Sequence, residues 1–137
     1  VAHPIDGFGA LVPECEGRKI LGVLFPSSLF PQRAPEGEVL LTVFIGGERQ
    51  PECATADTET PMATVLLELE QLLGIHGQPT FVHHTHWNKS LPQYKHGYAA
   101  QLEEMARTEQ NHTGLHSAGN YCTGISVTYC LEAALNL

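Results

Sequence analysis

Residues 115–127 combine a short apolar run, two glycine breaks and the start of a helical pattern. The run at 115–118 is typical of a strand, Gly119 and Gly124 interrupt the chain, and apolar residues recur at helical spacing from Ile125. A helix start leaves backbone N–H groups without partners, and glycine lets a flat or anionic ligand approach closely. The pattern suits a cofactor contact, but it also occurs wherever a strand turns into a helix.

Three histidines precede the chain's only tryptophan, Trp87. We expect residues 79–87 to form a strand, in which His84 and His86 share one face and His83 points to the other. A metal site needs ligands that converge on one point, and two histidines without an acidic third ligand do not provide one. We therefore expect no metal. Trp87 is either a core or interface anchor or an aromatic wall beside a planar ligand.

The composition restricts the class of protein. The 137 residues suffice for one domain with a substantial core. A net charge of −8 and the absence of a basic stripe argue against a nucleic-acid partner. Charged residues make up 16% of the chain, against about 25% in typical domains. This low charge indicates extensive buried surface, from a large core, a ligand cavity or a face that another chain covers.

The cysteines predict a reducing environment. Cys15, Cys53, Cys122 and Cys130 form no C-x-x-C pair, which argues against a zinc ribbon or a thioredoxin-like motif. Their even number allows disulfides, but the spacing is not that of a disulfide-dense domain, so we expect buried free thiols. No signal-peptide pattern is present, and no apolar run reaches the ~18 residues of a membrane span. We expect a cytoplasmic location, and peripheral attachment to a membrane stays open.

Apolar runs and chain breakers predict an α+β fold. We expect strands at residues 7–13, 20–25 and 39–45 and a loop at 27–37. The short connections favour an antiparallel or mixed sheet. Helical spacing predicts amphipathic helices at residues 60–73, 98–106 and 125–136.

The three predicted strands are apolar on both faces. A half-solvated sheet would alternate apolar and polar residues, so both faces of this sheet should be covered. Leu11, Leu24 and Phe44 are therefore candidates for a cavity wall. A role as plain core residues is the alternative.

Several stretches resemble one known family, in the same order. They are HPIDGFGALVP at 3–13, GVLF at 22–25, LFPQRAP at 29–35, LTVFIGG at 41–47, LLGI at 72–75, WNKSLPQY at 87–94 and LHSAGN at 115–120. Together they resemble the C-terminal region of the protoporphyrinogen IX oxidases, FAD enzymes of haem and chlorophyll synthesis. The resemblance runs nearly end to end, and it implies that the chain is a C-terminal fragment of a longer enzyme.

The resemblance also implies a fold. The family belongs to the monoamine-oxidase-like flavoproteins, which have a Rossmann-type FAD lobe and a substrate lobe with a mixed sheet under helices. On that pattern, residues 1–78 belong to the substrate lobe. Residues 79–137 return to the FAD lobe, and 115–118 form a strand of its sheet.

The resemblance implies roles for particular residues. Leu11, Leu24 and Phe44 fall where the family holds the tetrapyrrole rings by apolar contact. His86 and Trp87 fall where it lines the isoalloxazine. A further four positions fall on the backbone segment that meets the flavin, namely Gly124, Ile125, Ser126 and Val127. A helix N-terminus there stabilises negative charge on the reduced flavin. No catalytic residue is assigned.

Two features depart from the family pattern. The family often has Arg-Gly-Gly where this chain has Cys122, Thr123 and Gly124, which leaves the local contact geometry open. No G-x-G-x-x-G occurs in the chain. We therefore expect the pyrophosphate-binding half of the FAD site to lie upstream.

The favoured hypothesis is an oxidase that converts protoporphyrinogen IX to protoporphyrin IX and passes electrons to oxygen or another acceptor. This stretch alone is then expected to be inactive and to self-associate through uncovered apolar faces. A related flavin amine oxidase or carotenoid desaturase is one alternative, and a tetrapyrrole-binding module without redox chemistry is another. Protoporphyrinogen and coproporphyrinogen are not distinguished as substrates.

Overall fold

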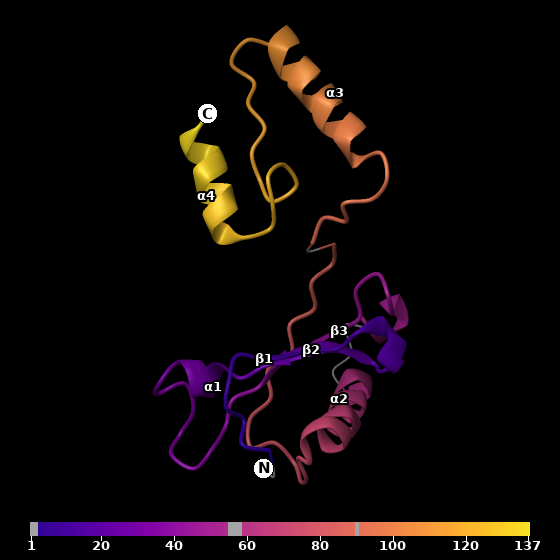
Figure 1. The fold of residues 1–137 in the computed structure, drawn as a ribbon, viewed down its shortest axis with the longest axis vertical. Coiled ribbons are helices and arrows are strands. Elements are labelled where there is room, and N and C mark those ends of the chain that lie inside the picture. Colours follow the sequence, from indigo (N-terminus) through magenta and orange to yellow (C-terminus); the bar gives the residue numbers. More distant parts are fainter. Residues whose placement is uncertain (1–2, 55–58, 90) are drawn as a thin grey trace. The chain divides into compact units, whose positions relative to one another are not determined.

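The computed structural model describes residues 3–54, 59–89 and 91–137, and it divides between His86 and Trp87 into two compact units (Figure 1). The first unit holds a β-sheet and the helix α2 (Glu59–Leu73). The second unit holds the helices α3 (Tyr98–Asn111) and α4 (Val127–Leu135). Within the described residues, the α+β class is confirmed.

The sheet has three antiparallel strands. They are β1 (Gly9–Leu11), β2 (Ile20–Leu24) and β3 (Thr42–Ile45), with β2 in the middle. The predicted antiparallel arrangement is therefore confirmed. The outer strands are shorter than the apolar runs at 7–13 and 39–45, because a strand extends only where its backbone groups pair with a neighbour.

The register of the sheet sorts its side chains onto two faces. Gly22 of β2 stands opposite Leu11 of β1 and Phe44 of β3. The next residue, Val23, stands opposite Ala10 and Val43. Because successive side chains in a strand point to opposite faces, these two rows lie on opposite sides of the sheet.

Helix α2 covers the face that carries Val23, and Figure 1 shows it below the sheet and inclined to the strands. Val23 is 1% exposed and packs in one core cluster with Leu69 and Leu73 of α2. The cluster is completed by Ile5 and Phe25, with Leu41, Val43, Val65, Leu72 and Ile75 packed against it. The amphipathic helix predicted at residues 60–73 is thus confirmed, and its apolar stripe forms the core of the first unit.

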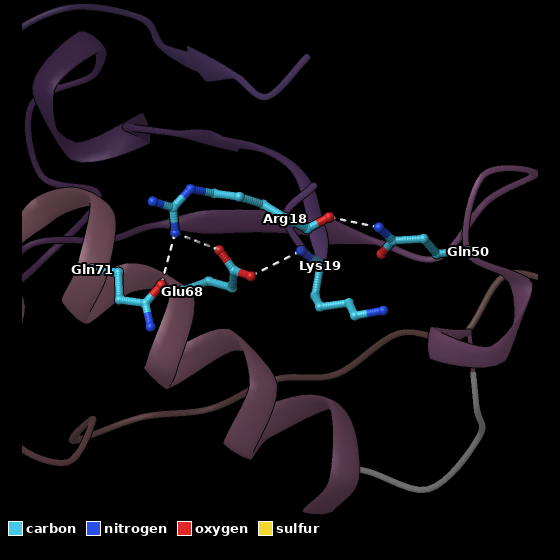
Figure 2. A network of polar contacts seen from close by, with 5 residues as sticks. All are labelled: Arg18, Lys19, Gln50, Glu68 and Gln71. Carbon is cyan, nitrogen blue, oxygen red and sulfur yellow. Dashed lines mark hydrogen bonds and ion pairs between the residues drawn. The ribbon is translucent and has the colours of Figure 1, made fainter. Parts of the chain in front are cut away.

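A buried carboxylate joins α2 to the turn before β2 (Figure 2). Glu68 is only 7% exposed, and its Oε1 accepts a hydrogen bond of 2.8 Å from the backbone N–H of Lys19. Its Oε2 lies 3.2 Å from Nη1 of Arg18, which also donates to Gln71 at 2.9 Å. Gln50 donates to the carbonyl of Arg18 at 2.5 Å. The network fixes the start of β2 on the helix.

Glu68→Ala is expected to lower the free energy of unfolding by about 1–3 kcal/mol, because it leaves the Lys19 N–H without its acceptor and leaves the Arg18 guanidinium with Gln71 alone. Chemical denaturation measures the change. Glu70→Ala is the matched control on the same helix, since Glu70 is exposed and pairs with His76 at 3.2 Å. It should cost about 0.5 kcal/mol or less. Equal losses from both variants would contradict a structural role for the buried carboxylate.

Three short helical turns complete the first unit. The one-turn helix α1 (Pro26–Leu29) occupies the start of the segment that we predicted as a loop at 27–37. Pro26 stands at its first position, where the missing N–H of proline costs nothing. The 3₁₀ turns η1 (Glu14–Glu16) and η2 (Pro51–Cys53) follow β1 and β3.

In the second unit, α4 begins two residues later than predicted. Ser126 is its N-cap, with an extended backbone, and the Ser126 hydroxyl accepts a hydrogen bond of 3.1 Å from the N–H of Tyr129. The apolar residues Val127, Leu131 and Leu135 recur every four positions and are 77%, 61% and 86% exposed. They form an uncovered apolar stripe along α4.

Two predicted strands are wrong. Residues 79–87 and 115–118 are irregular, with no ladder partner among the described residues. Their apolar character is real, but a strand forms only when its N–H and C=O groups pair with a neighbouring strand. Phe81 and Trp87 are accordingly 72% and 73% exposed. None of the helices in the described ranges is long and apolar enough to cross a membrane.

Candidate functional site

The structure brings Leu11, Leu24 and Phe44 onto one face of the sheet. Leu11 and Phe44 flank Gly22 in one row, and Leu24 lies two residues further along β2 on the same side. This is the face opposite α2. Leu11 is 87% exposed and Phe44 is 49% exposed, while Leu24 is half-buried. Within the described part of the chain, Leu11 and Phe44 are therefore not core residues.

This open sheet face has the chemistry of a platform for a flat apolar ring. Its two rows consist of Leu11, Gly22 and Phe44, and of Gly9, Leu24 and Thr42. None of these residues is charged. The row of Leu11 and Phe44 places an aromatic ring and an aliphatic side chain on either side of a glycine, and aromatic side chains favour stacked contacts. A planar ligand without charge at its centre fits this surface.

A cavity of about 350 Å³ lies beside β1. Its lining includes Ala10, Val12 and Val23 together with Leu72 and Leu73 of α2, and Arg18 stands at its wall. Leu24 and Phe44 do not line it. Leu11 of the open sheet face does line it, so the cavity borders that face at this one residue.

In the second unit, residues 117–122 are tied to the region of α3 by side chains that sequence reasoning missed. The Tyr94 hydroxyl donates to the carbonyl of Asn120 at 2.7 Å. The Tyr98 hydroxyl donates to the carbonyl of Tyr121, and lies 3.3 Å from that of Cys122. The ring centroids of the two tyrosines lie 4.8 Å apart. Tyr94 precedes α3, so no helical spacing in the sequence signals this pairing.

A carboxylate holds the start of the same segment. Oε1 of Glu109, near the end of α3, accepts a hydrogen bond of 2.6 Å from the backbone N–H of Ser117. Nothing in the spacing of the sequence signals this contact, because it joins a helix side chain to the backbone of an irregular stretch.

The surroundings of the nearby tyrosine and thiol raise the pKa of both groups. Partial burial, with Tyr94 and Cys122 beside it, raises the pKa of Tyr98 above its ordinary value. Burial also raises the pKa of Cys122, and the neighbouring Glu109 carboxylate and Cys130 thiol add to the effect. Both groups therefore keep their protons at neutral pH and remain hydrogen-bond donors.

Gly124, Ile125, Ser126 and Val127 form the turn into α4. Gly124 has a φ of 140°, which favours glycine, and a Cβ there would lie 2.7 Å from the ring of Tyr129. Ser126 satisfies the N–H of Tyr129 and the N–H of Cys130. The N–H groups of Val127 and Thr128 make no hydrogen bond within the described ranges. Two backbone donors at a helix N-terminus suit an anionic ring edge, so this donor set fits a reduced flavin.

His86 and Trp87 stand at the boundary of the two units. His86 ends the first unit and Trp87 begins the second, and both side chains are exposed. The 73% exposed indole of Trp87 presents an aromatic surface to solvent. The predicted substrate residues thus lie together in the first unit, and the turn at 124–127 lies in the second.

Metal ligands do not cluster in the part of the chain that the structure describes. No three His, Cys, Asp or Glu side chains there are grouped as a metal site. Within the histidine-rich stretch, His83 instead contacts the hydroxyl of Thr85 at 3.1 Å.

Comparison with known families gives one match over nearly the whole chain. Residues 2–136 match the family described as flavin-containing amine oxidoreductase. The match includes both the open sheet face and the turn at 124–127.

Curated relatives carry names of porphyrinogen oxidases. The chain is 43% identical to the mitochondrial protoporphyrinogen oxidase of Nicotiana tabacum, over 99% of this chain and 28% of that protein. It is 41% identical to protoporphyrinogen oxidase 2 of Arabidopsis thaliana, a chloroplastic and mitochondrial protein, over 93% of this chain and 26% of that one. It is 31% identical to a coproporphyrinogen III oxidase of Propionibacterium freudenreichii, over 98% of this chain and 26% of that protein. The chain therefore spans about a quarter of the length of these relatives.

Proposed function

The chain belongs to the flavin-containing amine oxidoreductase family, and we propose that it is the C-terminal part of an FAD-dependent oxidase that converts protoporphyrinogen IX to protoporphyrin IX. The observation that carries this proposal is the open apolar face, on which Leu11, Leu24 and Phe44 from three strands lie together. The names of the two plant relatives support the choice of a porphyrinogen as substrate.

The first unit supplies the substrate contacts in this proposal, as part of a substrate lobe made by residues 1–78. Leu11 and Phe44 hold the tetrapyrrole rings by apolar contact, and Leu24 extends the same surface along β2. Burial of a side chain of this size contributes about 1.5–3 kcal/mol. The face excludes water from the ring and sets its orientation.

The second unit supplies flavin contacts, as part of an FAD lobe that takes in residues 79–137. Val127 and Thr128 offer backbone N–H groups to the ring edge, and Gly124 lets the ring approach. Resemblance to the family adds Trp87, and His86 at the end of the first unit, as residues that line the isoalloxazine. The chemistry that FAD supplies when bound is acceptance of hydride equivalents from the porphyrinogen and delivery of electrons to oxygen or another acceptor. The chain's residues orient the ring and stabilise negative charge on it.

The proposal includes properties of the whole protein. The pyrophosphate-binding half of the FAD site lies in residues upstream of this stretch, so this stretch alone is inactive. The apolar stripe of α4 and the open sheet face promote self-association when nothing covers them. A cytoplasmic location and peripheral attachment to a membrane stay predictions, and the two plant relatives above are named as mitochondrial or chloroplastic.

The test is flavin binding and porphyrinogen oxidation by the full-length parent protein. We expect bound-flavin absorbance, and faster oxidation of protoporphyrinogen than of coproporphyrinogen. Phe44→Ser should raise KM at least about tenfold, because it removes about 1.5–3 kcal/mol of apolar contact. It should leave bound flavin unchanged.

Val39→Ser provides the matched control, because Val39 is a 43% exposed apolar residue that precedes β3 and lies outside the open face. Its KM should stay at the wild-type value. A parent protein without flavin would rule out the oxidase. Faster turnover of coproporphyrinogen would assign the other substrate.

A further inference from the structure

Three side chains, two from α3 and one from the residues before it, form hydrogen bonds to the segment that leads into the turn at 124–127. We name Tyr94, Tyr98 and Glu109 the α3 clamp. The tyrosine hydroxyls donate to carbonyls of residues 120–122, and the Glu109 carboxylate accepts from the N–H of Ser117. The contacts bridge 8 to 26 positions along the chain, so they are tertiary contacts that set the path of the segment.

The clamp also sets the direction of one backbone donor next to the turn. All peptide bonds of the described residues are trans, so the N–H of each residue points away from the carbonyl before it. The Cys122 carbonyl faces the Tyr98 hydroxyl at 3.3 Å. The N–H of Thr123 is therefore directed away from Tyr98, and it makes no hydrogen bond among the residues described.

Hydrogen bonds also join the turn region to α4. The Thr123 hydroxyl donates to the carbonyl of Tyr129 at 3.3 Å, and the Cys130 thiol donates to the carbonyl of Gly124 at 3.7 Å. The turn is thus fixed between two elements, with the clamp on one side and the first turns of α4 on the other. A preorganised set of donors costs less free energy to align when a ligand binds.

We propose that Tyr94, Tyr98 and Glu109 are positioning residues that hold the backbone donors of Thr123, Val127 and Thr128 in place for an anionic flavin ring edge. This inference rests on the proposed function. The clamp residues do not touch the ring, and they act through the backbone of residues 117–123.

The experiment uses the full-length flavoprotein with Tyr98→Phe and, separately, Glu109→Ala. Each variant loses a hydrogen bond between the clamp and the backbone of the segment. FAD binding must then realign the backbone donors, which should weaken it about five- to tenfold. Each should also shift the midpoint potential of the bound flavin to a more negative value, because the reduced anionic ring loses aligned donors. Tyr94→Phe should shift the potential in the same direction. Glu109→Gln keeps an acceptor oxygen and should restore the wild-type potential.

Matched controls come from the same segment and helix. Tyr121→Phe removes a hydroxyl that makes no hydrogen bond in the described part of the chain, and Glu103→Ala removes an exposed carboxylate of α3. Both should keep the wild-type affinity and potential. The inference is overturned if the clamp variants match these controls, or if they lower thermal stability while the bound flavin keeps its potential. A wild-type parent without flavin would overturn the proposed function itself, and the clamp inference with it.

Discussion

Leu69→Ala is expected to lower the free energy of unfolding by about 2–5 kcal/mol, the usual cost of emptying a leucine site in a closed core. Leu69 is 6% exposed and lies in one cluster with Val23 of the sheet and Phe25 directly after it. The cavity left by alanine would open at the contact between α2 and the sheet. Chemical denaturation of the parent protein measures the loss.

The matched control is the same leucine-to-alanine change two residues earlier in α2. Leu67 lies on the same helix but is 55% exposed, so Leu67→Ala should change the free energy of unfolding by about 0.5 kcal/mol or less. A comparable loss at both positions would mean that α2 does not bury the stripe that contains Leu69. A loss confined to Leu69 supports the packing of α2 on the sheet.

Gly124→Ala is expected to weaken FAD binding by the parent protein about tenfold. Alanine at a φ of 140° is strained, and its Cβ would lie 2.7 Å from Cδ2 of Tyr129. Relief of this strain moves the turn or the start of α4 away from its position. Restoring that position on binding costs about 1–2 kcal/mol, which is about a tenfold change in Kd. Titration of the apoprotein with FAD measures it.

Gly114→Ala separates this effect from backbone strain in general. Gly114 also has a positive φ, 87°, but a Cβ there would meet nothing within 4 Å. The variant should lose about 1 kcal/mol of stability and keep the wild-type Kd for FAD. If Gly114→Ala weakened FAD binding as much as Gly124→Ala, the turn at 124–127 would have no special role.

The sequence predicted those elements whose pattern is local. The runs at 7–13, 20–25 and 39–45 contain the three strands, because a β-rich apolar run bounded by breakers needs only near neighbours to pair. The leucine spacing before Gly74 predicted α2, and Gly74, with a φ of 60°, ends that helix by donating to the carbonyl of Glu70.

The wrong predictions concern residues whose structure depends on distant partners. The stretch at 115–118 has the apolar character of a strand, but its chain path is set by Glu109 and by the tyrosines at 94 and 98. No pattern within a short window contains these contacts. The same holds for residues 79–87, where apolar side chains are exposed and the backbone has no ladder partner in the described ranges.

In the candidate site, too, local patterns predict one part and leave the other part unpredicted. Strand alternation and register explain why Leu11, Leu24 and Phe44 share a face, once β1, β2 and β3 are known to be neighbours. Their proposed contact with a tetrapyrrole came from resemblance to a family, and no rule of spacing provides it. Neither strand alternation nor the family resemblance pointed to the α3 clamp, because its side chains contact backbone atoms.

The single tryptophan gives the molecule an intrinsic optical reporter. Trp87 is the only indole in the 137 residues, and it stands 73% exposed at the boundary between the two units. Its fluorescence therefore comes from one defined place, and the wavelength of its emission reports the polarity around that place. An indole in water emits to the red of one that a planar partner has covered. A blue shift or quenching of this emission would mark the covering of Trp87, without any label attached to the protein.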